Sequence, residues 1–333
     1  MSYRTIGKSE LKLSAITFGA WAAGGWMWGG TDTNDAIAAI RAGYEHGITS
    51  VDTAAIYGQG ESEKIVGEAL KEFPRDKVQI LTKFGMRWDL PADFNGKAWE
   101  TQNNDGQDIK VYRHASKESV IYEVEQSLKR LKTDYIDLYQ IHWPDLETPI
   151  EETFEAVLRL KEQGKIIEAG VSNYSAAQTA EANAVVSIAS NQVTYSALKR
   201  DIEKELVPYA IENNIGIIAY SPMEKGLLTG KIKPGYHFNE GDHRADLPWF
   251  KGENLNQVNI LLDKVRPIAE EKNATLAQLF LRWTIDQPGV VVALAGARDA
   301  KQAIENAGAM QLSLSAEEIA LIRTAAEAVH LTA

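Results

Sequence analysis

The chain has 333 residues, of which 44% are hydrophobic and 24% charged, a composition typical of a soluble globular protein with a large core. Its formal net charge of −11 argues against non-specific binding to nucleic acid or to an anionic membrane, since both favour a basic surface. Because the sequence contains no cysteine, it excludes disulfides, cysteine nucleophiles and thiolate metal sites.

The sequence carries no pattern typical of secretion or membrane insertion. The opening residues, Met1–Gly7, lack the apolar segment of a signal peptide. No apolar run reaches the roughly 18 residues that a transmembrane helix requires. We therefore expect a cytoplasmic protein.

Short runs rich in β-branched residues alternate along the chain with amphipathic segments of helical periodicity. The predicted strands, in chain order, are Ala15–Gly19, Ile48–Asp52, Val78–Lys83, Ile136–His142, Ile166–Ser172, Asn191–Tyr195, Ile215–Tyr220 and Val290–Ala295. The helical segments between them include Asp32–His46, Ser62–Phe73, Lys117–Leu131, Ile150–Gln163, Ala176–Asn183 and Glu203–Asn213. Eight strands in this alternation predict a parallel sheet closed into a (β/α)8 TIM barrel rather than an open sheet.

Two predicted elements lie outside this repeat. Tyr3–Ile6 and Leu11–Leu13, separated by a polar turn, predict an N-terminal β-hairpin. Ser315–Val329 predicts an extra C-terminal helix laid against the barrel. Because no stretch has the composition of a linker, we expect residues 1–333 to form a single domain.

Two connections are unusually long and rich in aromatic residues, namely Gly85–Ala115 and Gly230–Asn256. Long connections in compact domains tend to be functional or disordered, and a high density of aromatic residues argues against disorder. Both connections follow predicted strands, so they belong at the carboxyl end of the barrel, where active sites of this fold lie. We expect them to form pocket walls.

Ionisable residues stand at the ends of three consecutive predicted strands. The second, third and fourth predicted strands end in Asp52, Lys83 and His142, respectively. Tyr57 follows Asp52 by five residues. An ammonium near a phenol favours the tyrosinate, so we expect Lys83 to lower the pKa of Tyr57. A tyrosine tuned in this way can donate a proton to a carbonyl oxygen.

Each of these residues alone also has a structural explanation. An aspartate after a strand is usually a cap or turn residue, and a strand-end lysine is more often structural than catalytic. His142, which precedes Trp143 and Pro144, fits a satisfied histidine on the barrel rim. Only the joint arrangement favours an active site, and it leaves open whether His142 orients a carbonyl group or assists proton transfer.

A set of short segments gives a more specific indication. They are Gly19 after the first barrel strand, Asp52–Gly58, Thr82–Lys83, Asp137–Pro144, Gly170–Tyr174, Asn191–Gln192 and Ala219–Pro222. Together they resemble the aldo-keto reductase family over nearly the whole chain. The turn Gly24–Gly30 is similar to bacterial members of the inositol-operon and general-stress type.

The resemblance implies NADPH-dependent reduction of aldehydes or ketones, without a metal ion. It implies a catalytic tetrad of Asp52, Tyr57, Lys83 and His142, with Tyr57 as the acid. It also implies that Ser172, Asn173 and Gln192 hold the nicotinamide carboxamide and that Tyr220 stacks on its ring. The other cofactor contacts expected near the nicotinamide and pyrophosphate are Gly19, Trp21, Ser221, Pro222, Met223, Gly226, Leu227, Thr229 and Lys231.

The segment from Gly296 to Asn306 would bind the adenosine end of the cofactor in this family. Arg298 suits a 2′-phosphate through bidentate hydrogen bonds at a helix N-terminus, which favours NADP over NAD. Glu305 and Asn306 would contact the adenine. The sequence departs from many relatives, which have a lysine at Gly296 and an arginine at Gln302. Arg244 is either a second cationic contact or a solvated surface residue.

Seven of the eight tryptophans fall on predicted loops at the carboxyl end of the barrel. They either form an aromatic substrate pocket or pack the loops together, and we expect a mixture. The expected pocket residues are Trp21, Trp26, Trp28, Trp88 and Trp143. Trp283 is expected in a helix, as a core residue.

Two other classes of function remain as alternatives. A nucleotide-sensing binding protein with little turnover would resemble the potassium-channel β subunits, but the intact tetrad argues against it. A metal-dependent sugar isomerase would need more carboxylates and histidines at strand ends than Asp52 and His142 supply. We therefore expect a small-molecule carbonyl compound as the partner of this chain, and a monomer. The sequence identifies neither the physiological substrate nor the preferred direction.

Overall fold

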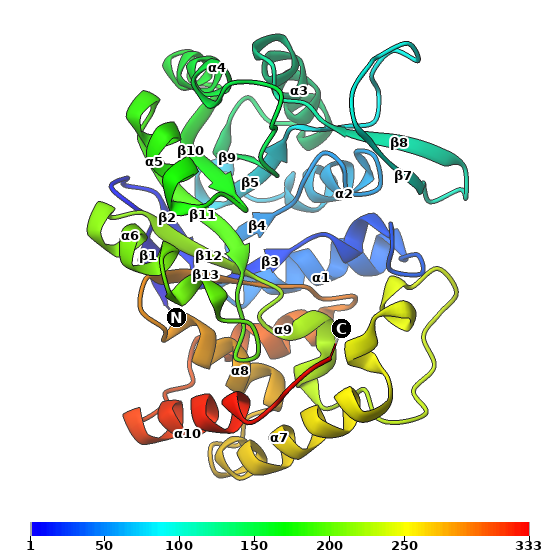
Figure 1. The fold of residues 1–333 in the computed structure, drawn as a ribbon, viewed down its shortest axis with the longest axis vertical. Coiled ribbons are helices and arrows are strands. Elements are labelled where there is room, and N and C mark those ends of the chain that lie inside the picture. The colour runs from blue at the N-terminus through cyan, green and yellow to red at the C-terminus, as the bar shows by residue number, and fades with distance from the viewer. Residues whose placement is uncertain (1, 333) are drawn as a thin grey trace.

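The computed structural model describes residues 2–332 and is built around a closed barrel of eight parallel strands, in the order β10-β11-β12-β13-β3-β4-β5-β9 (Figure 1). The barrel strands are β3 (Ile16–Gly19), β4 (Ser50–Asp52), β5 (Gln79–Phe84), β9 (Ile136–Ile141), β10 (Ile166–Ser172), β11 (Ile188–Thr194), β12 (Gly216–Tyr220) and β13 (Val290–Ala295). The predicted (β/α)8 barrel is thus confirmed.

Helices cover the outside of the barrel. They are α1 (Thr33–Glu45), α2 (Glu61–Leu70), α3 (Lys117–Leu131), α4 (Ile150–Glu162), α5 (Ala176–Val185), α6 (Leu206–Asn213), α7 (Gly252–Glu271), α8 (Leu276–Ile285), α9 (Ala300–Gly308) and α10 (Ala316–Glu327). Short 3₁₀ helices are η1 (Ala22–Gly24), η2 (Arg75–Lys77), η3 (Asp201–Glu203), η4 (Glu224–Thr229), η5 (His243–Asp246) and η6 (Pro248–Phe250). The extra C-terminal helix, α10, packs against α7 (Figure 1). None of the helices in residues 2–332 is long and apolar enough to cross a membrane.

The N-terminal hairpin closes one end of the barrel. Its strands, β1 (Tyr3–Thr5) and β2 (Lys12–Ser14), pair antiparallel as predicted. Ile6 and Leu13 are fully buried in a cluster with Leu81 and Leu138 of the barrel strands. Gly7 has φ +59° and lies so close to a neighbouring strand that a Cβ there would meet the Ala189 carbonyl oxygen at 2.6 Å. Because this end is plugged, ligands have access from the carboxyl ends of the strands.

Most differences from the predicted boundaries lie at the ends of elements, where assignments commonly shift by a residue or two. β11 begins at Ile188, whereas the prediction began at Asn191. The prediction missed the first residues because Ala189 and Ser190, although buried, are small and form no apolar run. α6 begins at Leu206 rather than Glu203, after the separate turn η3. Trp283 lies in α8 and is fully buried, as predicted.

The connection from Gly85 to Ala115 is a small sheet rather than an irregular loop. Its strands are β6 (Met86–Arg87), β7 (Ala98–Gln102) and β8 (Asp108–Arg113), in the antiparallel order β6-β8-β7. Figure 1 shows β7 and β8 projecting away from the barrel. The prediction missed this sheet because β7 is largely exposed and polar and so lacks apolar alternation. The other long connection contains η5 and η6 and ends where α7 begins, at Gly252.

Candidate active site

Asp52 and Lys83 form a buried ion pair at the carboxyl ends of β4 and β5. The Lys83 Nζ atom lies 2.5 Å from Asp52 Oδ1, and its side chain is fully buried. It also donates a hydrogen bond of 2.8 Å to the Thr53 carbonyl oxygen. The second oxygen of Asp52 accepts hydrogen bonds from the side-chain amides of Gln192 at 2.8 Å and Gln140 at 3.3 Å. Every charge of the pair therefore has a polar partner.

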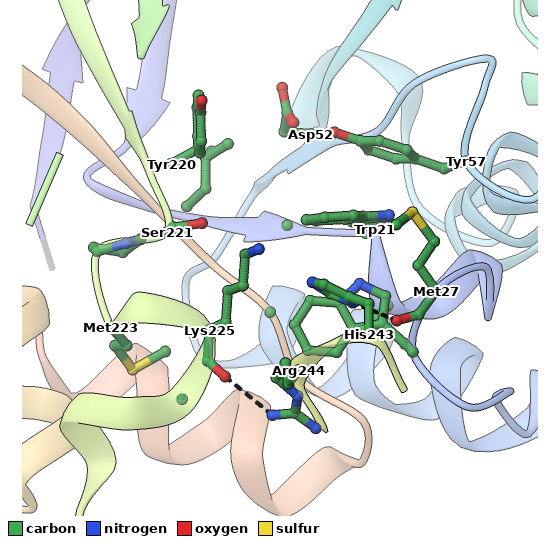
Figure 2. Close-up of a pocket in the computed structure, with 18 of the residues that line it drawn as sticks. Trp21, Met27, Asp52, Tyr57, Tyr220, Ser221, Met223, Lys225, His243 and Arg244 are labelled. Atoms are coloured by element: carbon green, nitrogen blue, oxygen red, sulfur yellow. Dashed lines mark hydrogen bonds between the residues drawn. The ribbon is translucent and has the colours of Figure 1, made fainter. Parts of the chain in front are cut away.

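Tyr57 lies in the turn after β4, among three groups that fix its ring. The Lys83 Nζ atom is 5.2 Å from the ring centroid, and the His142 ring makes an edge contact at 5.6 Å. The Trp21 ring stacks on Tyr57 at 5.8 Å with 22° between the planes (Figure 2). Gly24 holds the Trp21 loop against this turn, since a Cβ there would meet the Tyr57 carbonyl oxygen at 2.9 Å. The barrel thus brings the four predicted tetrad residues together.

The expected lowering of the Tyr57 pKa is wrong. Burial, followed by the nearby Asp52 carboxylate, raises the pKa of Tyr57 well above its usual 10. The expectation counted the Lys83 ammonium but not the carboxylate that pairs with it, nor the loss of hydration around the phenol. Tyr57 therefore carries its proton throughout the neutral range.

His142 is held in its neutral form. Burial, together with the positive charges of Lys83 and Arg113, lowers the pKa of the imidazole well below 6.5. A neutral imidazole has one N–H donor and one acceptor nitrogen. Its edge contact with the Tyr57 ring leaves His142 facing the same cavity as the Tyr57 side chain. His142 can therefore hydrogen-bond an uncharged ligand atom without itself supplying an acidic proton.

A cavity of about 710 Å³ opens beside this tetrad at the carboxyl end of the barrel. That volume is within the usual range of ligand sites, roughly 300–1,000 Å³. Asp52, Tyr57 and His142 line it, whereas Lys83 lies behind Asp52 and does not reach it. Figure 2 shows Lys225 of η4 on the opposite side of the cavity from Asp52 and Tyr57.

One wall next to His142 is a linked set of polar side chains. Asn173 donates to the His142 carbonyl oxygen at 3.0 Å and accepts from the Tyr220 hydroxyl at 2.9 Å. Ser172 donates to the Gln192 carbonyl oxygen at 2.8 Å. All four predicted carboxamide and ring contacts, Ser172, Asn173, Gln192 and Tyr220, line the cavity.

The segment from Ser221 to Lys231 forms a second wall with an unusual backbone. Three consecutive residues, Glu224, Lys225 and Gly226, have φ values of 45°, 54° and 97°. Successive residues in left-handed conformations turn backbone N–H groups into a concavity that is typical of anion sites. Among the predicted contacts, Leu227 is fully buried in the core and does not line the cavity, because the tight turn directs it inward.

The far end of the cavity is bounded by α9 and by two loops that are joined through Asp242. Arg244 pairs with the buried Asp242 carboxylate at 2.6 Å, so it is not a solvated surface residue. Arg298 donates to the Trp28 carbonyl oxygen at 2.6 Å and lies 3.7 Å from Asp242. Lys231 lies 3.7 Å from Glu305. The remaining predicted residues at this end, Gly296, Gln302 and Asn306, also line the cavity.

Four of the five tryptophans predicted for the substrate pocket line the cavity, namely Trp21, Trp26, Trp28 and Trp143. Trp88 does not, because it lies beside α3, where its ring faces Arg130 across a separate shallow depression. Trp99 takes a place in the wall instead. The prediction was wrong for Trp88 because β6 ends at Arg87 and the chain turns away from the barrel mouth.

Several lining residues were not predicted as site residues: Met27, Lys225, His243, Tyr236 and Arg113. His243 donates a hydrogen bond through Nδ1 to the Met27 carbonyl oxygen, and its ring contacts Trp21 and Trp28. Arg113 follows the buried Val111 by two residues along β8, so that both side chains lie on one face of the strand. That spacing was the available signal, but the surrounding sheet was read as a loop.

The chain is similar to known proteins over nearly its whole length. The aldo/keto reductase family model matches residues 15–327. The chain is 40% identical over 300 residues to aldo-keto reductase YhdN of Bacillus subtilis, covering 90% of this chain and 85% of that protein. It is 36% identical over 330 residues to the NADH-specific methylglyoxal reductase of Escherichia coli, covering 98% of each. The structure of glycerol dehydrogenase AKR11B4 from Gluconobacter oxydans matches with a TM-score of 0.85 and 36% identity, over 97% of this chain and 94% of that one.

Replacing Lys83 with methionine is expected to destabilise the fold by about 3–5 kcal/mol, because it leaves the Asp52 carboxylate buried without its counter-ion. The free energy of unfolding, measured by urea denaturation, checks this. Adding Asp52→Asn to Lys83→Met removes the uncompensated charge and should recover part of the loss. If the free energy of unfolding lost in the double variant equalled the sum of the losses in the two single variants, the pair would not be coupled.

Proposed function

Because the chain belongs to the aldo/keto reductase family and is therefore an oxidoreductase that reduces carbonyl groups, we propose that it converts aldehydes and ketones to alcohols with NADPH, using Tyr57 as the proton donor. The observation that carries this proposal is the position of the Tyr57 side chain, which lines the cavity between His142 and the Asp52–Lys83 pair.

The four tetrad residues have different roles in protonating the carbonyl oxygen. The N–H of His142 holds that oxygen by a hydrogen bond, and the Tyr57 hydroxyl transfers its proton to it. Asp52 and Lys83 hold the Tyr57 environment in place and neutralise each other. The nicotinamide, when bound, supplies the hydride that reduces the carbonyl carbon. In all, the carbonyl compound gains two electrons and one proton equivalent with the hydride, and a second proton from Tyr57. Tyr57 then regains a proton from solvent.

The cavity walls fit a nicotinamide dinucleotide. Ser172 and Asn173 suit a carboxamide beside the Tyr220 ring, and the left-handed segment Glu224–Gly226 suits a pyrophosphate. Within residues 2–332, the buried nitrogens Trp21 Nε1, Trp28 Nε1 and His243 Nε2 have no hydrogen-bond partner although their residues line the cavity. Polar atoms buried in this way usually have a partner, which a bound ligand would provide.

NADPH is proposed over NADH on the position of Arg298. Arg298 directly precedes Asp299, the N-cap residue of α9, and its guanidinium lies beside that of Arg244, since both contact the Asp242 carboxylate. An arginine there can bind a 2′-phosphate bidentately, which an unphosphorylated ribose lacks. The E. coli relative is named as NADH-specific, so the preference is a property to be tested in this chain itself.

The substrate is proposed to bind between Tyr57 and the tryptophans of the cavity mouth. Trp21 and Trp28 meet edge to face at 5.4 Å, and Trp26 contacts Trp99 at 5.7 Å. Such surfaces bury apolar and aromatic groups and leave indole N–H groups for polar ones. This wall accommodates both small and aromatic carbonyl compounds.

Tyr57→Phe is expected to reduce turnover of an aldehyde by about 10²- to 10⁴-fold, because it removes the proton donor but not the ring. NADPH affinity, measured by fluorescence titration, should stay nearly unchanged. Tyr236→Phe is the matched control, since Tyr236 also lines the cavity but lies far more exposed, at 47%. Unchanged turnover in Tyr57→Phe would refute the assigned role.

The rate of carbonyl reduction is expected to be nearly independent of pH between about 6.5 and 10, the ordinary pKa values of histidine and tyrosine. The raised pKa of Tyr57 keeps its proton in place as pH rises, and the lowered pKa of His142 keeps the imidazole neutral as pH falls. The check is kcat/KM for one uncharged aldehyde across this range. A fall that begins near pH 8 would show that Tyr57 ionises more easily than its burial implies.

Arg298→Leu is expected to raise the KM for NADPH by about 10-fold or more, from the loss of a charged hydrogen bond, while the KM for NADH changes little. Steady-state kinetics with both cofactors provide the comparison. Lys301→Leu removes a charge from the same helix outside the cavity and should change neither value. Equal increases for both cofactors would instead indicate that Arg298 supports the Trp28 loop through its hydrogen bond.

A further inference from the structure

Arg113 is an exposed cation of the cavity wall that no acidic side chain neutralises within residues 2–332. It is the last residue of β8, in the small sheet that projects beside the barrel mouth. Its side chain forms no hydrogen bond or ion pair that the structure shows between residues 2 and 332, and its guanidinium lies over the Trp143 ring at 4.9 Å. A guanidinium stacked in this way keeps its N–H groups free at the edges.

The position of Arg113 is set by the two-residue period of β8. Val111 and Arg113 share one face of the strand and both line the cavity, whereas Lys110 lies on the opposite face and does not. Trp143, on which Arg113 rests, directly follows His142 in the chain. The positive charge of Arg113 is close enough to His142 to contribute to the low pKa of that imidazole. Arg113 therefore stands at the end of the cavity where the carbonyl group reacts.

The other cations of the cavity lie elsewhere or are already paired. Arg244 and Arg298 lie against Asp242, and Lys231 lies beside Glu305. Lys225 lies over the Trp21 ring, 5.8 Å from its centroid, and belongs to the η4 segment that faces Tyr57 across the cavity. Arg113 is thus the unpaired base on the sheet side of the mouth.

Within residues 2–332, no carboxylate of the cavity wall lies opposite Arg113. The acidic residues that line the cavity are Asp52, which is paired with Lys83, and Glu305, which lies at the α9 end beside Lys231. The rest of the wall near Arg113 is aromatic or aliphatic, from Trp99, Val111 and Trp143. A negative group entering here would meet one free guanidinium and no repelling charge.

Building on the proposed function, we propose that Arg113 binds the carboxylate of the substrate, so that the chain favours aldehydes that also carry a carboxylate group. The planar guanidinium matches a carboxylate through two parallel N–H···O bonds. The carboxylate remains unchanged in the reaction. Only the aldehyde carbon takes up the hydride and its oxygen the proton, which yields a hydroxy acid.

The test compares 4-carboxybenzaldehyde with its neutral methyl ester, two substrates that share the same reacting group and ring. Arg113→Met is expected to lower kcat/KM for the acid by about 10- to 100-fold, mainly through KM, and to change the ester by less than about two-fold. Arg113→Lys should keep part of the preference. Lys110→Met, which removes the same charge from the opposite face of β8, should behave as the unchanged chain.

A binding measurement separates this inference from the proposed function. Benzoate and the uncharged benzamide are titrated against tryptophan fluorescence without any substrate, and Arg113→Met should weaken benzoate alone. Weaker benzoate binding in Arg113→Met would support the carboxylate site even if neither aldehyde were reduced. A lack of aldehyde reduction would by itself refute only the proposed function. Equal losses for acid and ester, or benzoate binding that Arg113→Met leaves intact, would overturn the role assigned to Arg113.

Discussion

The chemistry of this protein depends on one buried ion pair, between Asp52 and Lys83. Burying two charges is costly, and a structure retains them only where each finds close partners. Here the barrel supplies them from four strands, since β4 and β5 carry the pair while Gln140 of β9 and Gln192 of β11 saturate the carboxylate. The pair is therefore a product of barrel closure, because none of these partners lies near another in the sequence.

The same pair sets the protonation states around it. Its carboxylate adds to burial in keeping the proton on Tyr57, and its ammonium adds to burial in keeping the proton off His142. A proton donor and a neutral hydrogen-bond donor thus stand side by side over one cavity. Groups whose environments separate their pKa values are the usual basis for assigning acid and base roles.

The cavity has two ends with different chemistry. Toward α9, the loops are tied together by Asp242, which holds Arg244 and Arg298 in place. Toward the projecting sheet, the wall is aromatic and holds Arg113, which has no ion-pair partner among residues 2–332. The first end suits a large charged cofactor, while the second suits a smaller carbonyl compound with an apolar body.

Much of this arrangement could be predicted because barrel strands have a strong signature. Strands buried on both faces form continuous apolar runs, and their carboxyl ends converge, so Asp52, Lys83 and His142 were readily placed together. Residues on connections were harder. Trp88 and Leu227 were assigned to the cavity from their loops alone, yet one faces α3 and the other the core. A loop position does not determine a side chain's direction.

The sequence by itself determined the barrel, the family and the four residues proposed as the tetrad, because periodicity and short motifs are local properties of the chain. The tertiary structure decided the sign of the Tyr57 pKa shift, since burial and the distance to Asp52 exist only after folding. It also decided which cations are paired: Arg244 contacts Asp242, whereas Arg113 has no ion-pair partner in the described part of the chain. The sequence shows which side chains are charged, but the partners and the hydration of each charged group depend on residues that folding brings into contact.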